Sequence, residues 1–262
     1  MGTLPRVPFT LVQLTDTHIG APWGEGADVG LAAAATAVTR TLGAPPDAVI
    51  VTGDVASTPT AAEYVTARAV LDALDAPVYV LPGNHDDRAL MRDHFAFPAA
   101  EAGSLSYAVT LGPLRLVALD TTWPGHDGGQ LDRARLDWLA ATLAEDVATP
   151  TLLAVHHPPI LTGIRAMDAI GIAAGERAEL AAILEGHPQV QVVVAGHVHR
   201  AVVGALGTAR VLTVPSTDGQ LALDLESDTI AFVREPPAFA VHLVIDGQIV
   251  SHLQPVASEP AG

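Results

Sequence analysis

Five short runs of apolar residues along the chain each end abruptly in a group of polar residues. The runs are Phe9–Leu14, Ala48–Thr52, Pro77–Leu81, Thr151–Val155 and Val190–Ala195. Continuous apolar runs of this length are typical of strands that are buried on both faces, as in a sheet covered by helices. The pattern therefore predicts five interior strands and places a polar loop directly after each of them.

Segments of helical length lie between these runs. They are rich in alanine and leucine, which favour helices, and they span Asp28–Thr41, Ala61–Leu74, Asp132–Leu143 and Gly175–Glu185. The alternation of strands and helices predicts a layered α/β fold.

The pattern changes after Arg200, where strand-like stretches follow one another without helices between them. These stretches are Ala201–Leu206, Ala209–Val214, Leu221–Leu225, Ala238–Val244 and Ile249–Leu253. Gly207-Thr208 and Asp246-Gly247 look like hairpin turns, so we expect C-terminal antiparallel hairpins and a second sheet packed on the first. Because no repeat or linker divides the chain, we expect one domain over residues 1–255 and a frayed tail over 256–262.

Composition and charge exclude several kinds of partner. The chain has 262 residues, of which 49% are apolar, and its 29 acidic and 13 basic residues give a net charge of −16. Such a charge argues against binding to nucleic-acid polymers and gives no reason to expect binding to anionic membranes. No secretory signal and no membrane-spanning run is visible, so we expect a cytoplasmic protein. The absence of cysteine leaves histidine, carboxylate, amide or water to hold any metal.

The polar groups after the first two runs contain carboxylates and an imidazole. Asp16 and His18 are two residues apart, so at an extended strand end both would project to one side and could hold one cation; a turn Asp with a surface His is the alternative. Asp54 follows Gly53, which lets the backbone approach closely, and its two carboxylate oxygens could bridge two metal ions. The alternative for Asp54 is a helix cap.

The third polar group is Gly83-Asn84-His85-Asp86. Asn84 offers a neutral carbonyl oxygen as a ligand, and His85 can donate a proton to a phosphoryl oxygen or stabilise its charge. We expect Asp86 to orient the His85 imidazole, a pairing that often holds a histidine in its working state. A plain Asn-His turn is the alternative.

The last two polar groups contain pairs of histidines. Adjacent residues of an extended segment point in opposite directions, so we expect only one of His156 and His157 to be a metal ligand. His197 and His199 are two apart and should lie on one side, which favours a metal site over a satisfied surface pair. Since α/β sheets place ligand sites at the carboxyl ends of strands, we expect these remote side chains to converge.

The ordered motifs Asp-x-His, Gly-Asp, Gly-Asn-His-Asp, His-His-Pro and Gly-His-x-His, from Asp16 to His199, resemble the calcineurin-like metallophosphoesterase superfamily. Further stretches, among them Pro215-Ser216-Thr217 and Glu235-Pro236-Pro237, resemble its class III cyclic nucleotide phosphodiesterases and their bacterial glycerophosphodiesterase relatives. The resemblance implies a four-layer αββα sandwich of two mixed β-sheets flanked by helices.

The resemblance also implies the ligands of two metal ions. The positions that match the first ion are Asp16, His18, Asp54 and His199. The positions that match the second ion are Asp54, Asn84, His156 and His197, with Asp54 bridging. His85 would lie over the substrate phosphate, with Asn84 and His199 also at the substrate, and His157 would stand behind the ligands. Such donors accept iron, manganese, zinc or cobalt, and we favour iron and manganese.

The resemblance therefore implies a dinuclear metal-dependent phosphodiesterase. Two cations can clamp the attacking and leaving oxygens of an in-line displacement, and hydroxide that they make available attacks phosphorus. We expect small phosphodiesters as substrates, 3′,5′-cyclic nucleotides foremost. A glycerophosphodiesterase or a broad phosphomono- and diesterase is the alternative within this class, and a non-catalytic metal-binding scaffold is the alternative outside it. Relatives are often dimeric or larger, so we expect a homo-oligomer.

Three features bear on the shape of the substrate pocket. His126 lies on a glycine-rich loop and either lines the pocket or occupies an exposed turn. The segment Thr162–Ile172 shows no helical or strand period and could be a lid or an oligomer contact. Gly219 stands where many close relatives carry a bulkier polar residue, and this departure from the family pattern leaves pocket shape, and so substrate identity, open.

Overall fold

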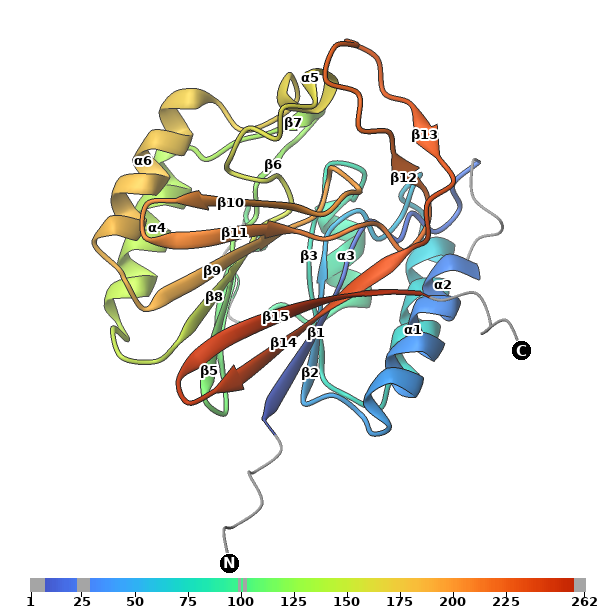
Figure 1. Ribbon diagram of the computed structural model, residues 1–262, viewed down its shortest axis with the longest axis horizontal. Coiled ribbons are helices and arrows are strands. Elements are labelled where there is room, and N and C mark those ends of the chain that lie inside the picture. Colours follow the sequence, from blue (N-terminus) through green and yellow to red (C-terminus); the bar gives the residue numbers. More distant parts are fainter. Residues whose placement is uncertain (1–7, 23–28, 99, 101–102, 257–262) are drawn as a thin grey trace, which may run out of the picture.

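The fold is described from a computed structural model, which places residues 8–22, 29–98, 100 and 103–256 (Figure 1). Its first sheet has the strand order β15-β14-β1-β2-β3. The strands of this sheet are β1 (Phe9–Leu14), β2 (Ala48–Thr52), β3 (Val78–Leu81), β14 (Ala238–Ile245) and β15 (Gln248–Pro255). The first three strands are parallel and the last two antiparallel, so the sheet is mixed.

The second sheet has the order β10-β11-β9-β8-β5-β4. Its strands are β4 (Tyr107–Leu111), β5 (Leu114–Ala118), β8 (Thr151–Ala154), β9 (Val190–Ala195), β10 (Val202–Leu206) and β11 (Ala209–Thr213). The four inner strands are parallel and the two edge strands antiparallel.

Three hydrophobic cores hold four layers together. Val49 and Val51 of β2 pack against α1 (Val29–Leu42) and α2 (Ala61–Asp72), while Ile50 points the other way, into the core between the sheets. On the second sheet Leu153 packs against α4 (Arg133–Ala144) and α6 (Ala174–Glu185). Interior strands therefore have no polar face, which explains their continuous apolar runs. The predicted αββα sandwich is confirmed.

Shorter elements complete the chain. Helices α3 (Arg88–His94) and α5 (Arg165–Asp168) follow β3 and β8, and two ribbons pair β6 (Thr122–Trp123) with β7 (His126–Gly129) and β12 (Gln220–Leu221) with β13 (Phe232–Val233). The predicted strand over Leu221–Leu225 is wrong beyond its first residue. The predicted helix start at Asp28 and the tail after residue 256 lie outside the described residues.

Both predicted hairpin turns are confirmed. Gly207-Thr208 joins β10 to β11, and Asp246-Gly247 joins β14 to β15. Asp246 (φ 50°) and Gly247 (φ 75°) both have positive φ, as a two-residue turn matched to the twist of its strands requires. Within the described ranges, none of the helices is both long and apolar enough to cross a membrane.

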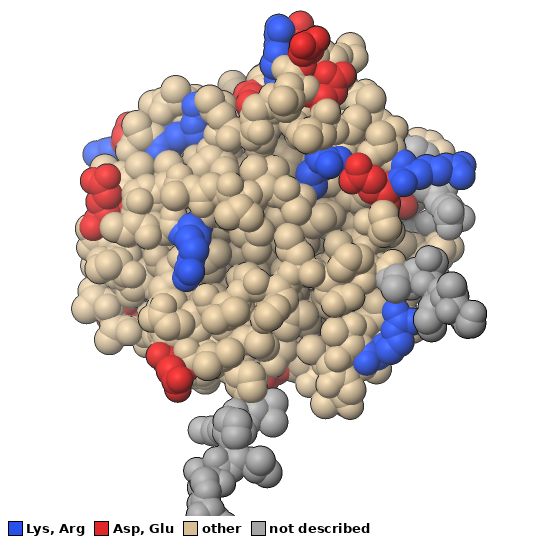
Figure 2. Space-filling model, viewed as in Figure 1, with Lys and Arg blue, Asp and Glu red and all other residues tan. Residues whose placement is uncertain are grey.

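Figure 2 shows the face on which β10, β11, β14 and β15 lie in Figure 1. Charged residues on this face are few and lie mainly toward its margins. The acidic excess of the chain is therefore not concentrated on this face.

The carboxyl ends of the interior strands of both sheets meet at one place. The backbone N–H of His197, after β9, donates to the carboxylate of Asp16, after β1, at 3.1 Å. The Gln13 side-chain amide, on β1, donates to the Thr52 hydroxyl of the same sheet (2.9 Å) and to the Ala195 carbonyl of the second sheet (3.3 Å). These contacts fix the loops of one sheet relative to those of the other.

Candidate metal centre

The backbone turns sharply where β1, β2 and β9 end. The residues in the left-handed region there are Asp16 (φ 49°), His18 (φ 43°), Asp54 (φ 50°), His197 (φ 68°) and His199 (φ 47°). Such a conformation costs a non-glycine residue about 1 kcal/mol or more, so the surrounding contacts must impose it. The N–H of Asp16 donates to the Gly53 carbonyl and that of His18 to the Asp54 carbonyl, each at 3.0 Å.

These turns correct one part of the sequence argument. The segments after the strands are not extended, so strand alternation is not what aims their side chains. Asp16 and His18 do lie together, but His197 and His199 turn toward different sets of neighbours. Both of the last two nevertheless line the same cavity.

Two glycines allow the loops to approach one another. A Cβ atom at Gly53, whose φ is 94°, would overlap the His156 ring, and one at Gly83 would overlap the Asp54 carboxylate. Any larger residue at either position would push the loops after β2, β3 and β8 apart.

The first set of converging side chains is Asp16, His18 and His199, whose donor atoms lie within 4.8 Å of one another. The Nε2 atoms of His18 and His199 are 3.1 Å apart, and Asp16 Oδ1 lies 3.4 Å from His199 Nε2. Asp54 Oδ2 lies 3.6 Å from His18 Nε2, at the side of this set that faces the second.

The second set contains Asn84, His156 and His197. Asn84 Oδ1 lies 3.1 Å from His156 Nε2 and 3.1 Å from His197 Nδ1, and Asp54 Oδ2 lies 3.3 Å from His156 Nε2. Among the described residues the buried Nε2 of His197 has no hydrogen-bond partner. Asp54 thus stands between the two sets, and the other six predicted ligands meet around it.

Electrostatics in the cluster favour cations. Burial would raise the pKa of Asp54, but His156 and His18 hold it well below its usual range. Burial would lower the pKa of His156, but Asp54 raises it to about 9. The pKa of His197 is held well below its usual range by burial and by the neighbouring His157. Two buried carboxylates, one amide oxygen and four imidazoles in mutual contact fit a pair of divalent ions.

The two adjacent histidines are distinguished by their hydrogen bonds. A carbonyl only accepts, so His156 donates from Nδ1 to the Thr52 carbonyl (2.8 Å) and turns Nε2 toward Asp54 and Asn84. His157 uses both ring nitrogens elsewhere, with Nδ1 at the Thr121 hydroxyl (2.8 Å) and Nε2 at the Asp127 carbonyl (3.1 Å). Burial and His156 lower its pKa to about 3. His157 therefore stands behind the ligands as a neutral ring.

His85 lies at the mouth of the cluster with its ring centroid 4.9 Å from that of His18. Its Nδ1 contacts the Ser57 carbonyl at 3.1 Å. The prediction that Asp86 orients this ring is wrong, because the Asp86 carboxylate binds the loops instead. It accepts hydrogen bonds from Gly83 N (2.9 Å), Val55 N, Ala56 N and Tyr64 Oη (3.1 Å each). Burial and the neighbouring Asp54 raise the pKa of Asp86 to about 6.

The cluster opens into a cavity of about 170 Å³. Most of the predicted ligands and His85 line it together with Met167 and Ile170, so the segment Thr162–Ile172 does shape the pocket. Asp127 lines it as well, whereas the exposed His126 stacks on Trp123 with ring centroids 3.8 Å apart. The Gly219 carbonyl contacts His199 Nδ1.

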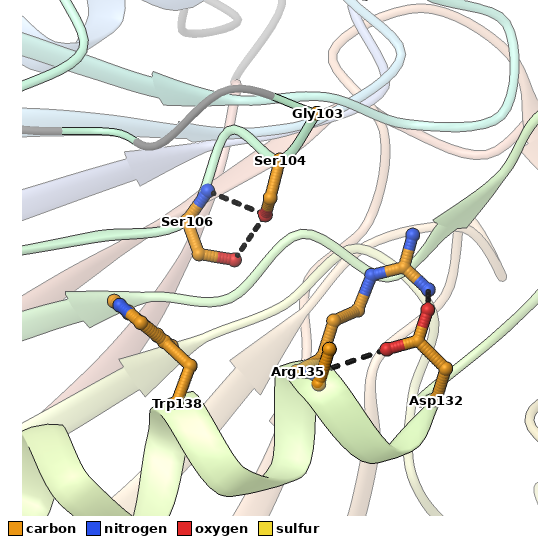
Figure 3. A pocket seen from close by; sticks show the side chains of 7 residues that line it. Gly103, Ser104, Ser106, Asp132, Arg135 and Trp138 are labelled. Atoms are coloured by element: carbon orange, nitrogen blue, oxygen red, sulfur yellow. Dashed lines mark hydrogen bonds and ion pairs between the residues drawn. The ribbon is translucent and has the colours of Figure 1, made fainter.

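A second cavity, of about 240 Å³, lies between residues 103–106 and α4 (Figure 3). Ser104 and Ser106 hydrogen-bond to one another there (2.9 Å), and Arg135 pairs with Asp132 (3.0 Å). No predicted ligand lines this cavity, and its guanidinium already has a carboxylate partner. The candidate metal ligands line the smaller cavity instead.

Comparisons with known proteins agree with this geometry. A family model described as calcineurin-like phosphoesterase matches residues 9–201. A protein named probable glycerophosphodiester phosphodiesterase, from Arcobacter nitrofigilis, is 38% identical over 200 residues, which cover 75% of this chain and 73% of that one. A protein named 3′,5′-cyclic adenosine monophosphate phosphodiesterase, from Pseudomonas aeruginosa, is 32% identical over 219 residues, 81% of this chain and 77% of that one.

The fold has a counterpart among solved structures. The crystal structure of a dimetal phosphatase from Danio rerio superposes with a TM-score of 0.68 at 16% identity, over 96% of this chain and 98% of that one. At this identity the likeness concerns the fold alone.

Proposed function

This chain belongs to the calcineurin-like phosphoesterase family, and from that membership we propose that it is a dinuclear metal-dependent phosphodiesterase acting on small phosphodiesters, 3′,5′-cyclic nucleotides foremost. The observation that carries the proposal is the convergence of two carboxylates, one amide and four imidazoles around Asp54. The name of the Pseudomonas aeruginosa relative supports the choice of substrate.

The ligands divide between two ions, with Asp54 shared. Asp16, His18 and His199 complete the first set, and Asn84, His156 and His197 complete the second. Ions bound there would neutralise charge on the phosphate oxygens and lower the pKa of a water molecule. The carbonyls of Thr52 and Gly219 hold His156 and His199 by their Nδ1 atoms, which leaves each Nε2 turned toward the other candidate ligands and able to bind an ion there.

His85 acts on the substrate from the mouth of the site. Because the Ser57 carbonyl can only accept, His85 Nδ1 is protonated and donates a hydrogen bond to it. When the ring is doubly protonated, Nε2 carries the second proton and can donate it, or a hydrogen bond, to a phosphoryl or leaving oxygen. Asp86 acts through the backbone, since its carboxylate ties the loop that carries Asp54 to the loop that carries Asn84 and His85.

The proposal is tested by turnover of bis(p-nitrophenyl) phosphate and cyclic AMP with added Mn²⁺. We expect His85→Asn to lower kcat by roughly 10²-fold or more, the usual contribution of a general acid, with metal content unchanged. The control is His252→Ala, which removes an exposed histidine of β15. Wild-type protein inactive with every divalent metal would refute the enzymatic function.

A glycerophosphodiesterase is the second candidate, favoured by the name of the Arcobacter nitrofigilis relative. The ratio of kcat/KM for cyclic AMP and glycerophosphoethanolamine separates the two. We further propose iron and manganese as the ions, one domain over the described residues, a cytoplasmic location and a homo-oligomer. Metal analysis, limited proteolysis, cell fractionation and light scattering test these in turn.

A further inference from the structure

The cavity at the candidate metal ligands is partly apolar. Met167, Ile170, Leu221, Ile230 and Phe232 line it, and we call these residues the apolar wall. They come from two segments that are remote in sequence, one around α5 and the other the ribbon of β12 and β13. Polar candidate ligands and apolar side chains thus line the same small cavity.

Specific contacts hold the two segments of the wall. Asp168 accepts hydrogen bonds from Thr162 N (2.8 Å) and Gly163 N (2.9 Å), which closes the loop before α5. The ribbon is extended by a bond from Ala222 N to the Ala231 carbonyl (2.8 Å). An ion pair between Arg165 and Asp228 (2.8 Å) joins the segments. The wall is therefore built as a unit.

The wall has a buried base and an open edge. Met167 and Leu221 are each 4% exposed and pack in a small core of their own, whereas Ile230 and Phe232 are each 48% exposed. Two large apolar side chains that are half exposed in the lining of a polar cavity are typical of the apolar part of a ligand pocket. Ile230 and Phe232, at this open edge, are therefore the residues of the wall that a ligand would contact.

Phe232 stands next to the ligands. Its ring centroid lies 6.1 Å from that of His199, with the ring planes at 66°. A phosphate held at the ligands would leave one of its ester substituents within reach of Phe232 and Ile230, which line the same cavity. A flat apolar substituent displaces water from that surface, while a glycerol or ethanolamine group gains little there.

We propose that Phe232 and Ile230 bind the organic substituent of the diester and make the enzyme select substrates with a flat apolar group, such as a nucleobase, over diesters of polar alcohols. This inference rests on the phosphodiesterase function proposed above. Phe232 and Ile230 are specificity residues, because they contact the part of the substrate that does not react.

A matched pair of substrates isolates this contact. Cyclic AMP and the 3,5-cyclic phosphate of 1-deoxyribose have the same phosphodiester ring and the same leaving oxygen, and differ only in the base. We expect Phe232→Ala to lower kcat/KM for cyclic AMP roughly three- to tenfold more than for the base-free compound, as expected for one lost aromatic contact. The loss should lie mainly in KM, because the contact is equal in ground and transition states.

Two further variants sharpen the test. Phe232→Leu keeps apolar area without the flat ring and should show a smaller difference between the substrates. Val203→Ala removes an exposed apolar side chain on β10 (75% exposed) and should change kcat/KM for neither substrate. Melting temperatures of all variants confirm that each is folded.

The outcomes separate the two proposals. Wild-type protein that hydrolyses both substrates, with Phe232→Ala affecting them equally or not at all, overturns the apolar wall and leaves the phosphodiesterase intact. Wild-type protein that hydrolyses neither of them, nor bis(p-nitrophenyl) phosphate, with any divalent metal overturns the function itself and the wall with it.

Discussion

The ion pair between Arg88 and Asp120 joins the loop that carries Asn84 and His85 to the second sheet. Arg88 is the first residue of α3, directly after that loop, and Asp120 follows β5. Nε of Arg88 lies 2.8 Å from one carboxylate oxygen and its terminal nitrogen donates to the other at 3.0 Å. The Asp120 side chain is fully buried and that of Arg88 is 21% exposed.

Arg88→Ala would leave a buried carboxylate without its cation. Removing one partner of a buried pair typically costs about 3–5 kcal/mol of unfolding free energy. Asp120 keeps hydrogen bonds from Leu105 N (3.1 Å) and Thr122 N (2.9 Å), and Arg88 is partly hydrated. The cost should therefore lie at the low end of this range. We expect a loss of about 3 kcal/mol, with lower kcat/KM in the fully folded protein because Asn84 and His85 lose their support.

Urea denaturation followed by tryptophan fluorescence measures the loss. Arg88→Lys keeps the charge but loses the two-atom contact, so about 1 kcal/mol is expected. In the double variant, Asp120→Asn removes the orphaned charge and should restore about 1–2 kcal/mol. The control is Arg68→Ala, which breaks an exposed pair with Asp72 (2.7 Å) and should cost about 0.5 kcal/mol or less.

The reasoning is refuted if Arg88→Ala costs no more than the control, since the pair would then behave as a surface contact. It is refuted equally if the double variant is no more stable than Arg88→Ala alone.

Three further predictions follow from the contacts of single residues. His156→Ala should lose one metal ion per chain while His157→Gln keeps both and loses stability; metal analysis that gives the reverse would exchange their roles. Gly53→Ala should lower metal affinity and cost about 1 kcal/mol or more, because φ is 94° and the new Cβ overlaps the His156 ring; unchanged calorimetric titrations would contradict this. Burial lowers the pKa of His242 to about 4 from 6.5, so its neutral ring contributes stability that is complete above pH 6.5 and is lost as pH falls through 4. The contribution is about 3 kcal/mol. His242→Gln should flatten the stability curve between these pH values, and a difference from wild type that does not change with pH would refute the assignment.

Interior strands could be predicted from the sequence because burial on both faces requires a continuous run of apolar residues. β1, β2 and β9 have the predicted bounds, since both of their faces are buried. β5 is equally buried but was not predicted, because Arg115 interrupts its apolar run; that side chain reaches Glu145 at 2.8 Å. β4 is an edge strand with mixed burial and shows no clear period. Such strands are defined by their contacts with other parts of the chain, and the local sequence pattern does not contain this information.

The identities of the converging residues could also be predicted, because metal ligation restricts residue type and strand ends restrict position. The groups that orient them could not. The carbonyls of Ser57, Thr52 and Gly219 hold three of the imidazoles, and a backbone carbonyl carries no signal in the residue sequence. Asp86 looked like a partner of its neighbour His85 but reaches backbone from two loops. The apolar wall comes from segments without periodicity, whose proximity only the fold reveals.

The central claim is that one cluster of side chains holds two ions with Asp54 between them. Calorimetric titration of metal-free protein with Mn²⁺, read together with electron paramagnetic resonance, tests it directly. We predict two ions per wild-type chain with magnetic coupling between them, and at most one uncoupled ion in Asp54→Asn. A single ion in the wild type, or two coupled ions in the variant, would contradict the account.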